Sequence, residues 1–533
     1  MVVPFRGRME LKKFIYFYLL AKPGSVQLIH QMKYSTFLRL CIVFASLVST
    51  GGLHAQSYSY WTQNFNEESS LLAGAVVGGG SGPSAIYFNP AAIAAGGKSV
   101  FSFNASLFSL GFYNMNNALG TDIDLTFSKL VVQPRFISLL LQPKWNRDVS
   151  MEVAVFNNAS FDLTMNDVVD RQMDILPQLP GDERYHALYR FWNKYRDDWL
   201  GIGGAWRVNQ NLLVGLSWFG TIKSLKYEQQ VDIDAMPLRD TIFDGTEAIP
   251  FYSANYTNTE AVRFNDYRML LKGGILYTGD RLSIGATIKT PSLRIYSDGK
   301  RVYRKEKQSN IMDESGEDFR EDYVIVDAQV KKAVKTNFKE PFSIAAGFVL
   351  HNDDESNSGF LTLEYFSSIK PYTIVSTPVN PSITTEKIFN SMSNKEWLSF
   401  AHAARPVFNV AIGYRQKIAE NLLLLTGFKT DLNYRRGADY QSYEDFNRMQ
   451  ALEINLYYVS VGLRLNIRGN ELITGLNYGF GNDQGRTQLI NLSDPVEYNH
   501  EEGKALMGTR QNNMDVIYNS ISLYFGANLK FMD

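Results

Sequence analysis

The sequence has almost no cysteine and no long apolar segment. Its single cysteine, Cys41, lies close to the N-terminus, so the rest of the chain can form neither a disulfide nor a thiolate metal site. Beyond the N-terminal region no segment approaches the roughly 18 uninterrupted apolar residues that a membrane-spanning helix needs, and 20% of the residues are charged. These features exclude a disulfide-rich domain and a bundle of membrane helices.

Signals of nucleic-acid binding and of catalysis are also missing. The formal net charge is −1, which provides no general basic surface for nucleic acid. The histidines after residue 60, His186, His351, His402 and His500, are isolated in the sequence, and there is no GxSxG motif and no metal-binding histidine spacing. We therefore expect no enzyme, metal or cofactor, although a barrel hydrolase could use His402 beside Ser399.

The strongest positive signal is strict alternation between apolar and polar residues. Near the C-terminus, Ile521, Leu523 and Phe525 fall on one face of an extended chain, and the residues between them are serine and tyrosine. The segment 457–467 repeats the pattern and places Arg464 in mid-strand on its polar face. One face suits lipid and the other suits water, and helical spacing explains neither segment.

Short polar connections join these alternating segments into hairpins. They lie at Pro143–Asp148, Val208–Asn211, Gly279–Asp280, Asn352–Ser358, Ala419–Glu420 and Arg468–Asn470. Six hairpins supply twelve strands, and Val100–Phe112 and Ser520–Phe531 add one at each end. The even total of fourteen fits a bacterial outer-membrane barrel.

Long connections alternate with these short ones. They lie at Asn114–Gln133, Ser160–Arg196, Glu228–Val262, Ser292–Glu340, Pro371–Arg405, Asp431–Ala451 and Asn482–Tyr518. Short turns on one side and long loops on the other are typical of barrels in the outer membrane of Gram-negative bacteria. The sequence therefore predicts an all-β fold, a 14-stranded antiparallel transmembrane β-barrel over residues 98–533. A large soluble β-sandwich or a solenoid is the alternative, but mid-strand arginine and lysine argue against the first and the lack of a repeat against the second.

The N-terminal region resembles a secretory signal. Lys33 and Arg39 form a basic start, an apolar run spans residues 40–48, and small residues precede Gln56. We expect a signal peptide over residues 32–55, with cleavage after Ala55. Residues 1–31 are then best explained by a misassigned upstream start codon.

The segment Asn66–Gly97 is rich in alanine and glycine and contains Asn89, Pro90 and Ala91. No Lys-Ser or Lys-Thr pair follows its glycines, which excludes a phosphate-binding loop. Small residues allow close backbone packing, and Asn-Pro favours a turn before a short alanine-rich helix. We therefore expect residues 56–97 to form a plug inside the barrel.

This segment resembles the FadL/TodX family of outer-membrane transporters. The resemblance rests on Ala73–Ile93, where Asn89-Pro90-Ala91 matches the family's plug motif, and on the fourteen expected strands. It implies that the plug closes the barrel, that extracellular loops capture a hydrophobic ligand, and that the ligand leaves sideways through a kinked strand into the bilayer. The ligand-binding residues of the family cannot be transferred, because the loops match no family motif.

Two groups of side chains are candidates for ligand contact. In the second long loop, Tyr185, Leu188, Trp192 and Tyr195 follow helical spacing among cationic residues, which suits capture of an amphipathic carboxylate. The alternative is a loop helix that packs this stripe onto the barrel rim.

Inward positions of the expected strands also carry an excess of cations. They include Arg207, Arg268, Lys272, Arg415 and Arg464. A cationic lumen would favour an anionic head group. The alternative is that these charges pair with the plug and with one another.

The sequence thus predicts a passive outer-membrane transporter, expected to be a monomer, for hydrophobic small molecules such as long-chain fatty acids or aromatic hydrocarbons. Its partners would be that ligand and the outer-membrane lipids. The alternative function is that of a non-transporting barrel similar to the PorV-type component of type IX secretion, which binds protein signals.

Overall fold

The computed structural model describes residues 58–61, 67–96, 99–179, 181–238, 242–243, 248–249, 252–311, 323–352, 356–377, 383–385, 397–444 and 446–530. The expected signal peptide, the upstream segment and Cys41 lie outside these ranges. Among the described residues, no helix is both long enough and apolar enough to cross a membrane.

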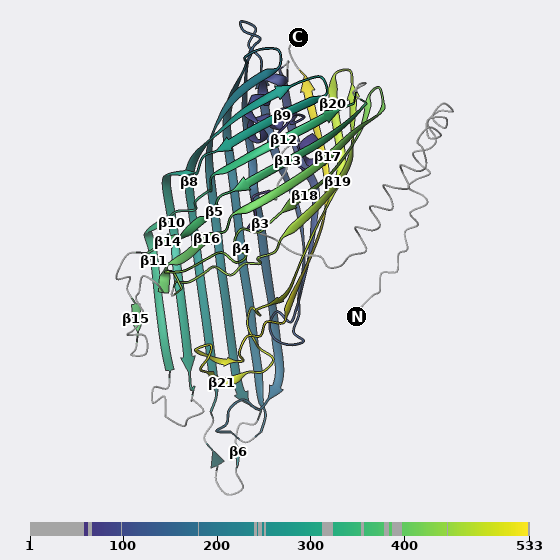
Figure 1. Ribbon diagram of the computed structural model, residues 1–533. Helices are drawn as coiled ribbons and strands as arrows, with labels where there is room; N and C mark the ends of the chain where they lie inside the picture. Colours follow the sequence, from purple (N-terminus) through teal and green to yellow (C-terminus); the bar gives the residue numbers. More distant parts are fainter. Residues whose placement is uncertain are drawn as a thin grey trace, which may run out of the picture. The chain divides into compact units, whose positions relative to one another are not determined.

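Fourteen strands of the described chain form a closed antiparallel ring (Figure 1). Around the ring they are β1 (Val100–Asn116), β2 (Leu125–Leu141), β3 (Val149–Met173), β4 (Glu183–Arg207), β5 (Leu212–Pro237), β8 (Ala254–Thr278), β9 (Leu282–Lys289), β12 (Ser343–His351), β13 (Asn357–Phe366), β17 (Val407–Ala419), β18 (Leu422–Asp431), β19 (Leu456–Ile467), β20 (Asn470–Arg486) and β23 (Met514–Lys530). Each strand pairs with the next, and β23 pairs with β1 to close the ring. The predicted barrel and its six hairpin turns are confirmed.

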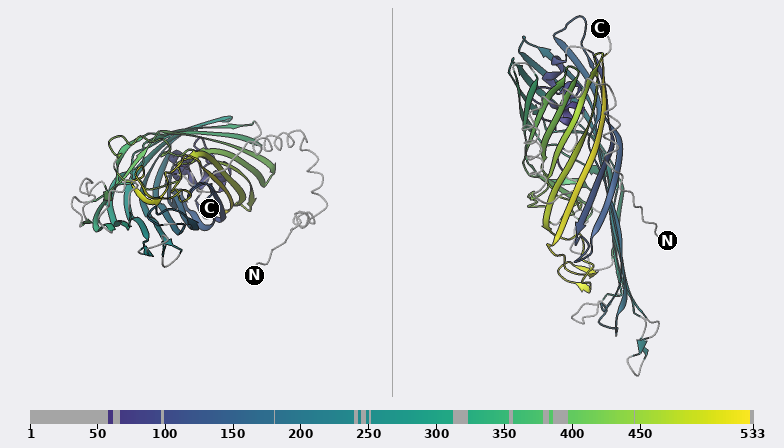
Figure 2. Two further views of the ribbon diagram at one scale, coloured as in Figure 1. Left: turned by 90° about the horizontal axis from the view of Figure 1, so that it is seen from below. Right: turned by 90° about the vertical axis from the view of Figure 1, so that its right-hand side faces the viewer.

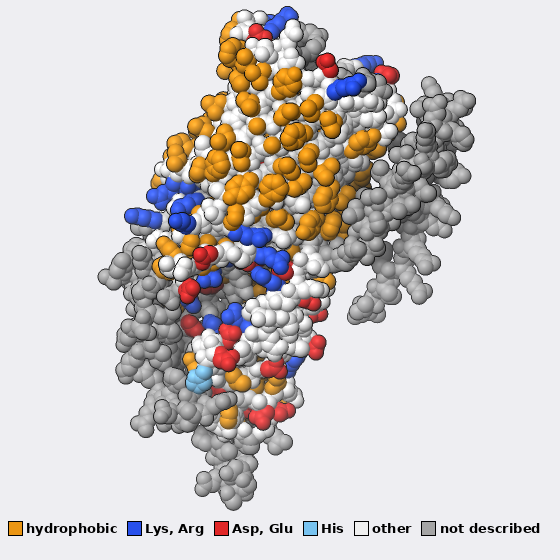
Figure 3. All heavy atoms as spheres, in the orientation of Figure 1, with side chains coloured by type: hydrophobic (Ala, Val, Ile, Leu, Met, Phe, Trp, Pro, Cys, Tyr) orange, Lys and Arg blue, Asp and Glu red, His pale blue; other side chains and the backbone are white. Residues whose placement is uncertain are grey.

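Apolar side chains form a band around the outside of this ring. The outward residues include Ile202, Leu216, Ile288, Ile344, Ile412 and Ile521, all of them exposed. Figure 3 shows such side chains gathered over β9, β12, β13 and β17. Their burial in the hydrocarbon region of a bilayer removes this surface from water.

Several strands continue beyond the band, where loops were expected. Strands β3 and β4 are separated only by the residues between Met173 and Glu183, and β5 and β8 only by those between Pro237 and Ala254. The prediction of loops at 160–196 and 228–262 is therefore largely wrong. In this outer part of β4, inward residues such as Tyr185 remain aromatic, but outward residues such as Arg190 are charged. The strands continue because the alternation continues with water, rather than lipid, on the outer face.

Further strands occupy other predicted loops. They are β6 (Ile242–Phe243), β7 (Ala248–Ile249), β10 (Leu293–Ser309), β11 (Tyr323–Thr336), β14 (Ile369–Ser376), β15 (Ile383–Thr385), β16 (Phe400–Ala404), β21 (Val496–Asn499) and β22 (Lys504–Met507). The segment 292–340 is therefore mostly strand, which corrects the prediction of a loop. The connection predicted at 431–451 is confirmed, because β18 ends at Asp431 and β19 begins at Leu456.

On one side of the barrel the wall is interrupted near the outer edge of the apolar band, and Leu293, Ile295 and Tyr296 of β10 are still exposed just beyond the break. Both β9 and β10 pair with β8, so they occupy the same position in the wall as two strands separated by a break at residues 290–292. Comparable breaks separate β11 from β12 at 337–342, β13 from β14 at 367–368, and β16 from β17 at 405–406. Three of the four breaks contain a proline, Pro291, Pro341 or Pro406, which cannot donate a ladder hydrogen bond.

The N-terminal elements lie inside the ring (Figure 2). They are α3 (Glu67–Leu71), the 3₁₀ turn η2 (Gly82–Ser84), α4 (Ala85–Phe88) and the 3₁₀ helix η3 (Pro90–Ala95). The Asn89 side chain caps η3 by accepting from the amide of Ala91 at 3.1 Å, and its Nδ2 donates to the wall carbonyl of Ile275 at 3.1 Å. The expected plug and the short alanine-rich helix after Asn89 are thus present.

Glycines on the inner face of the wall make room for the plug backbone. A Cβ added at Gly215 would lie 2.3 Å from the Pro90 carbonyl carbon, and one at Gly285 would lie 2.0 Å from the Val77 carbonyl oxygen. These distances are too short for any side chain. The plug therefore rests directly against backbone of the wall strands.

Candidate functional site

A cavity of about 420 Å³ lies inside the barrel. It is bordered by the plug, by the N-terminal residues Tyr58–Tyr60 and by the inner faces of the strands. Tyrosines are prominent in its lining and include Tyr58, Tyr60, Tyr113, Tyr195, Tyr434 and Tyr458. Tyrosine offers an apolar ring and one polar atom, so this lining suits a ligand that is mostly apolar.

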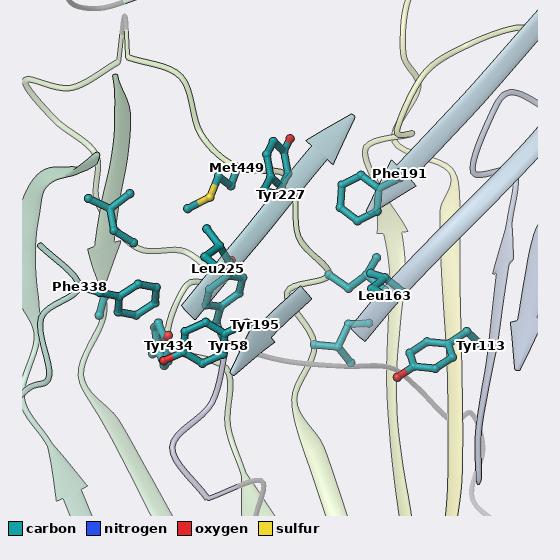
Figure 4. Packing of buried hydrophobic residues seen from close by; sticks show 14 of the residues in the cluster. Tyr58, Tyr113, Leu163, Phe191, Tyr195, Leu225, Tyr227, Phe338, Tyr434 and Met449 are labelled. Atoms are coloured by element: carbon teal, nitrogen blue, oxygen red, sulfur yellow. The ribbon is translucent and has the colours of Figure 1, made fainter. Parts of the chain in front are cut away.

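Aromatic packing fixes the shape of this lining (Figure 4). Tyr60 stacks between Phe366 and Tyr434, with ring centroids at 4.3 and 4.5 Å. Tyr195 stacks on Phe338 at 5.3 Å. Tyr60 in particular resists rearrangement because its ring is held on both sides.

A chain of buried charges crosses the wall of the cavity. Lys223 Nζ lies 2.7 Å from both Asp197 Oδ2 and Glu340 Oε1, and Lys289 Nζ lies 3.3 Å from Glu340 Oε2. Burial disfavours ionised Glu340, but the two ammonium groups outweigh it and lower the pKa of this carboxyl. The two cations and two anions balance, so this cluster of buried charges adds no net charge to the cavity wall.

The cavity reaches the outside between β2 and β3. These strands pair only where Phe136–Leu141 faces Met151–Phe156. Farther out, β2 pairs only with β1 and β3 only with β4 in the described part of the chain, so two strand edges face each other without backbone hydrogen bonds between them. The separation begins near Pro134, whose nitrogen carries no hydrogen, and near the bulge in β3 between Asn157 and Ala159.

One ion pair spans this gap. Lys129 Nζ of β2 lies 3.1 Å from Asp162 Oδ2 of β3, and Lys194 of β4 approaches the same oxygen to 3.0 Å. Leu130 and Ser160 border the cavity beside this pair. The wall is thus held together here by partly exposed side chains rather than by backbone hydrogen bonds, and such pairs are individually weak.

Three of the predicted lumen cations bind the plug. Arg464 Nη1 and Arg415 Nη1 lie 2.7 and 3.5 Å from the two carboxylate oxygens of Glu68 in α3. Arg207 Nη2 donates to the Ala94 carbonyl at 2.8 Å. These cations therefore hold the plug in place, and their interactions do not support selection of an anionic ligand.

The other two predicted lumen cations also contact groups of the wall or the plug. Arg268 Nη1 lies 3.0 Å from Asp266 and also donates to Asn337, whereas Nε and Nη2 donate to Ser292. Lys272 Nζ lies 4.9 Å from the centre of the Tyr87 ring in the plug. The alternative reading of the inward charges, in which they pair with the plug and with other wall groups, describes the structure better.

The predicted capture stripe does not exist as a helix. Tyr185, Leu188, Trp192 and Tyr195 all belong to strand β4. Because side chains alternate along a strand, Tyr185 and Tyr195 point inward, with Tyr195 only 7% exposed, whereas Trp192 points outward and is 38% exposed. The helical spacing was a coincidence of aromatic residues on a long strand, and only Tyr195 of the four borders the cavity.

His402 and Ser399 do not form a catalytic pair. His402 is buried among the rings of Tyr58, Phe338 and Tyr434, and burial, with a smaller effect of Arg435, lowers the pKa of its imidazole to about 3. The Ser399 hydroxyl instead lies 3.2 Å from the Thr377 hydroxyl. A neutral imidazole within this aromatic cluster serves packing.

Sequence reasoning missed the parts of the site that depend on strand pairing. The signal for the gap was present in Pro134 and in the run Asn157-Asn158, but a single sequence does not show which neighbouring strand would separate. Residues Tyr58–Trp61 lie within the predicted plug segment, but their contacts with the wall were not predicted. Trp61 Nε1 donates to Glu364 at 2.6 Å and the Trp61 amide donates to Asp431 at 2.8 Å, partners more than 300 residues away.

A closed 14-stranded ring with an apolar outer band and an internal plug defines an outer-membrane β-barrel with an obstructed lumen. Solved structures share this fold. A FadL homologue of Pseudomonas aeruginosa aligns over 90% of this chain and 100% of its own, with a TM-score of 0.51 and 11% identity. The P. putida toluene transporter TodX aligns over 88% and 99%, with a TM-score of 0.51 and 14% identity.

The chain therefore has the fold of the FadL/TodX channels, as its plug motif indicated. No protein-family model matches the sequence, and no curated protein matches it significantly. The likeness lies in the three-dimensional arrangement rather than in the residues.

Proposed function

We propose that this protein is an outer-membrane channel through which hydrophobic small molecules enter the central cavity and then leave sideways between β2 and β3. The observation that carries this proposal is the continuity of the tyrosine-lined cavity with the gap, where Leu130 and Ser160 line both. The shared fold with a FadL homologue and with the toluene transporter TodX supports it.

The lining favours an uncharged or weakly polar ligand. The buried charges of the cavity wall are paired, and the stacked rings around Tyr60 and Tyr195 offer apolar surface with scattered hydroxyls. An aromatic hydrocarbon, or the apolar part of a fatty acid, would gain contact with these rings without separating the buried Lys223, Asp197 and Glu340 from their partners. The plug blocks the direct path through the barrel, which leaves the side gap as the exit.

Uptake is the direct test. Cells that express the protein should accumulate labelled toluene or oleate faster than cells that lack it, without energy from an inner-membrane complex. Equal uptake by both cell types, with the folded barrel present in the outer membrane, would contradict the proposal. Co-purification with secreted proteins in that case would favour the PorV-type alternative.

A cross-link across the gap tests the sideways exit. We expect the variant Lys129→Cys/Asp162→Cys, joined by a short thiol-specific cross-linker with a cleavable disulfide, to lose uptake down to the level of cells without the protein. Cleavage of the linker should restore uptake, because only the width of the gap has changed. The control joins strands that are already paired, through Asp198→Cys/Ile222→Cys, and should retain uptake. Full uptake by the linked gap variant would exclude this exit.

Tyr195 and Trp192 should differ in their effect on uptake. Tyr195→Ala removes a ring that borders the cavity, so we expect slower uptake per folded molecule. Trp192→Ala removes an outward ring 4.6 Å from Lys226 Nζ and should leave uptake unchanged. A selective loss with Trp192→Ala would instead support capture on the outer surface.

A further inference from the structure

The outer wall is hollowed where its strands are interrupted. A groove of about 300 Å³ lies among the breaks at 290–292, 337–342 and 367–368, and Lys339 and Lys370 line it. The groove begins just beyond Ile288 and Ile344, the outermost exposed apolar residues of β9 and β12. Figure 3 shows lysine and arginine side chains along this margin of the apolar band.

Three cations at the groove have no acidic partner. Lys339, Lys370 and neighbouring Arg294 form no ion pair with any residue that the structure describes. Arg294 Nη1 donates to the Thr336 carbonyl at 2.9 Å, which leaves its other donors available, and Lys339 Nζ lies 4.3 Å from the Tyr372 ring. The hydroxyls of Ser367 and Ser368 lie in the same groove.

The acidic residue in the groove does not neutralise these cations. The Glu340 carboxylate is bound to Lys223 and Lys289 on the cavity side. Arg268, which also lines the groove, is compensated by Asp266 at 3.0 Å. Partial burial and the nearby Arg268 guanidinium lower the pKa of Lys339, so a bound anion would stabilise the charged form of this lysine.

We propose that this groove binds a phosphate group of a phosphorylated glycolipid in the outer leaflet. Lysine, arginine and serine donors suit phosphate oxygens. The acyl chains of the same molecule would lie on the apolar band at Ile288 and Ile344, directly below the cations. Free phosphate would use only half of this surface.

Native mass spectrometry of the detergent-solubilised protein tests the proposal, with lipid A as the probe. We expect one high-affinity lipid A to remain bound, and we expect lipid A without its phosphates to bind much more weakly. Inorganic phosphate at millimolar concentration should not displace the lipid. Displacement by inorganic phosphate would instead identify an anion site without lipid recognition and overturn the proposal.

The variant Lys339→Gln/Lys370→Gln/Arg294→Gln should weaken lipid A binding roughly tenfold or more, because it removes the charge-assisted contacts. The matched control, Arg184→Gln/Arg263→Gln/Arg510→Gln, removes three exposed cations that pair with Asp170, Glu228 and Glu502. The control should bind as the unmodified protein does. Equal binding by both triple variants, each shown to be folded by its heat-modifiable migration, would overturn the proposal.

Lipid binding and transport can fail separately. Loss of toluene uptake with lipid A binding intact would contradict the proposed function and leave the groove assignment standing. Retained uptake with no phosphate-dependent lipid binding would overturn the groove assignment and leave the proposed function standing.

Discussion

Replacing Gly285 with valine should displace the plug and raise the conductance of the barrel in planar bilayers. A Cβ at this position would lie 2.0 Å from the Val77 carbonyl oxygen, and the neighbour is backbone that cannot rotate away. Overpacking of this kind costs roughly 1–3 kcal/mol, which the contacts of one short plug segment cannot easily absorb. Gly215→Val should act similarly, because its Cβ would meet the backbone of Pro90 at 2.3 Å.

The matched controls are Gly204→Val and Gly359→Val. Nothing lies within 4 Å of a Cβ added at either position, so the same change of residue should leave conductance unchanged. Deletion of residues 67–96 provides a second measurement that does not depend on a wall substitution. A folded deletion variant with the original conductance would show that this segment does not obstruct the lumen.

Replacing Lys223 with methionine should destabilise the barrel strongly. The Lys223 side chain is 0% exposed, and its ammonium bridges Asp197 and Glu340 at 2.7 Å each. Removal of one partner from a buried ion pair typically costs about 3–5 kcal/mol, because the remaining charges stay buried. The temperature at which the compact electrophoretic form disappears should therefore fall well below that of the unmodified protein.

Two comparisons separate lost charge balance from lost packing. Lys194→Met removes an exposed cation that also pairs with a carboxylate, Asp162, and should change stability by only about 0–1 kcal/mol. The double variant Lys223→Met/Asp197→Asn removes one cation and one anion, leaves Glu340 paired with Lys289 at 3.3 Å, and should recover much of the stability. If it is no more stable than Lys223→Met alone, packing rather than charge dominates at this position.

The barrel itself could be predicted from the sequence because the lipid-facing alternation is local. Ile521, Leu523 and Phe525 reveal strand β23 without knowledge of any partner strand. The outer part of β4 was predicted as a loop because several of its outward residues are charged and do not show the apolar alternation of the lipid-facing band. There the informative face is the inward one, where Tyr185, Tyr189 and Tyr195 alternate with polar or smaller residues.

The site depends on contacts that a single sequence does not encode locally. Glu68 was not distinguished from other acidic residues, yet it binds Arg415 and Arg464 across more than 340 residues of chain. The lumen cations could be placed on the inner face by their register. Their partners could not be predicted, because the position of the plug along the barrel follows from packing against wall glycines rather than from the plug sequence alone.

The separated edges of β2 and β3 also determine where water must be. Their backbone N–H and C=O groups have lost ladder partners over the outer part of β2, and in hydrocarbon each such group would cost several kcal/mol. These backbone groups therefore need water, supplied by the lumen or by the exterior. Lipid acyl chains cannot pack directly against them. A departing ligand would pass these hydrated backbone edges before reaching the acyl chains of the lipids. The rate of exit would then depend on how readily that water is displaced as well as on the width of the opening.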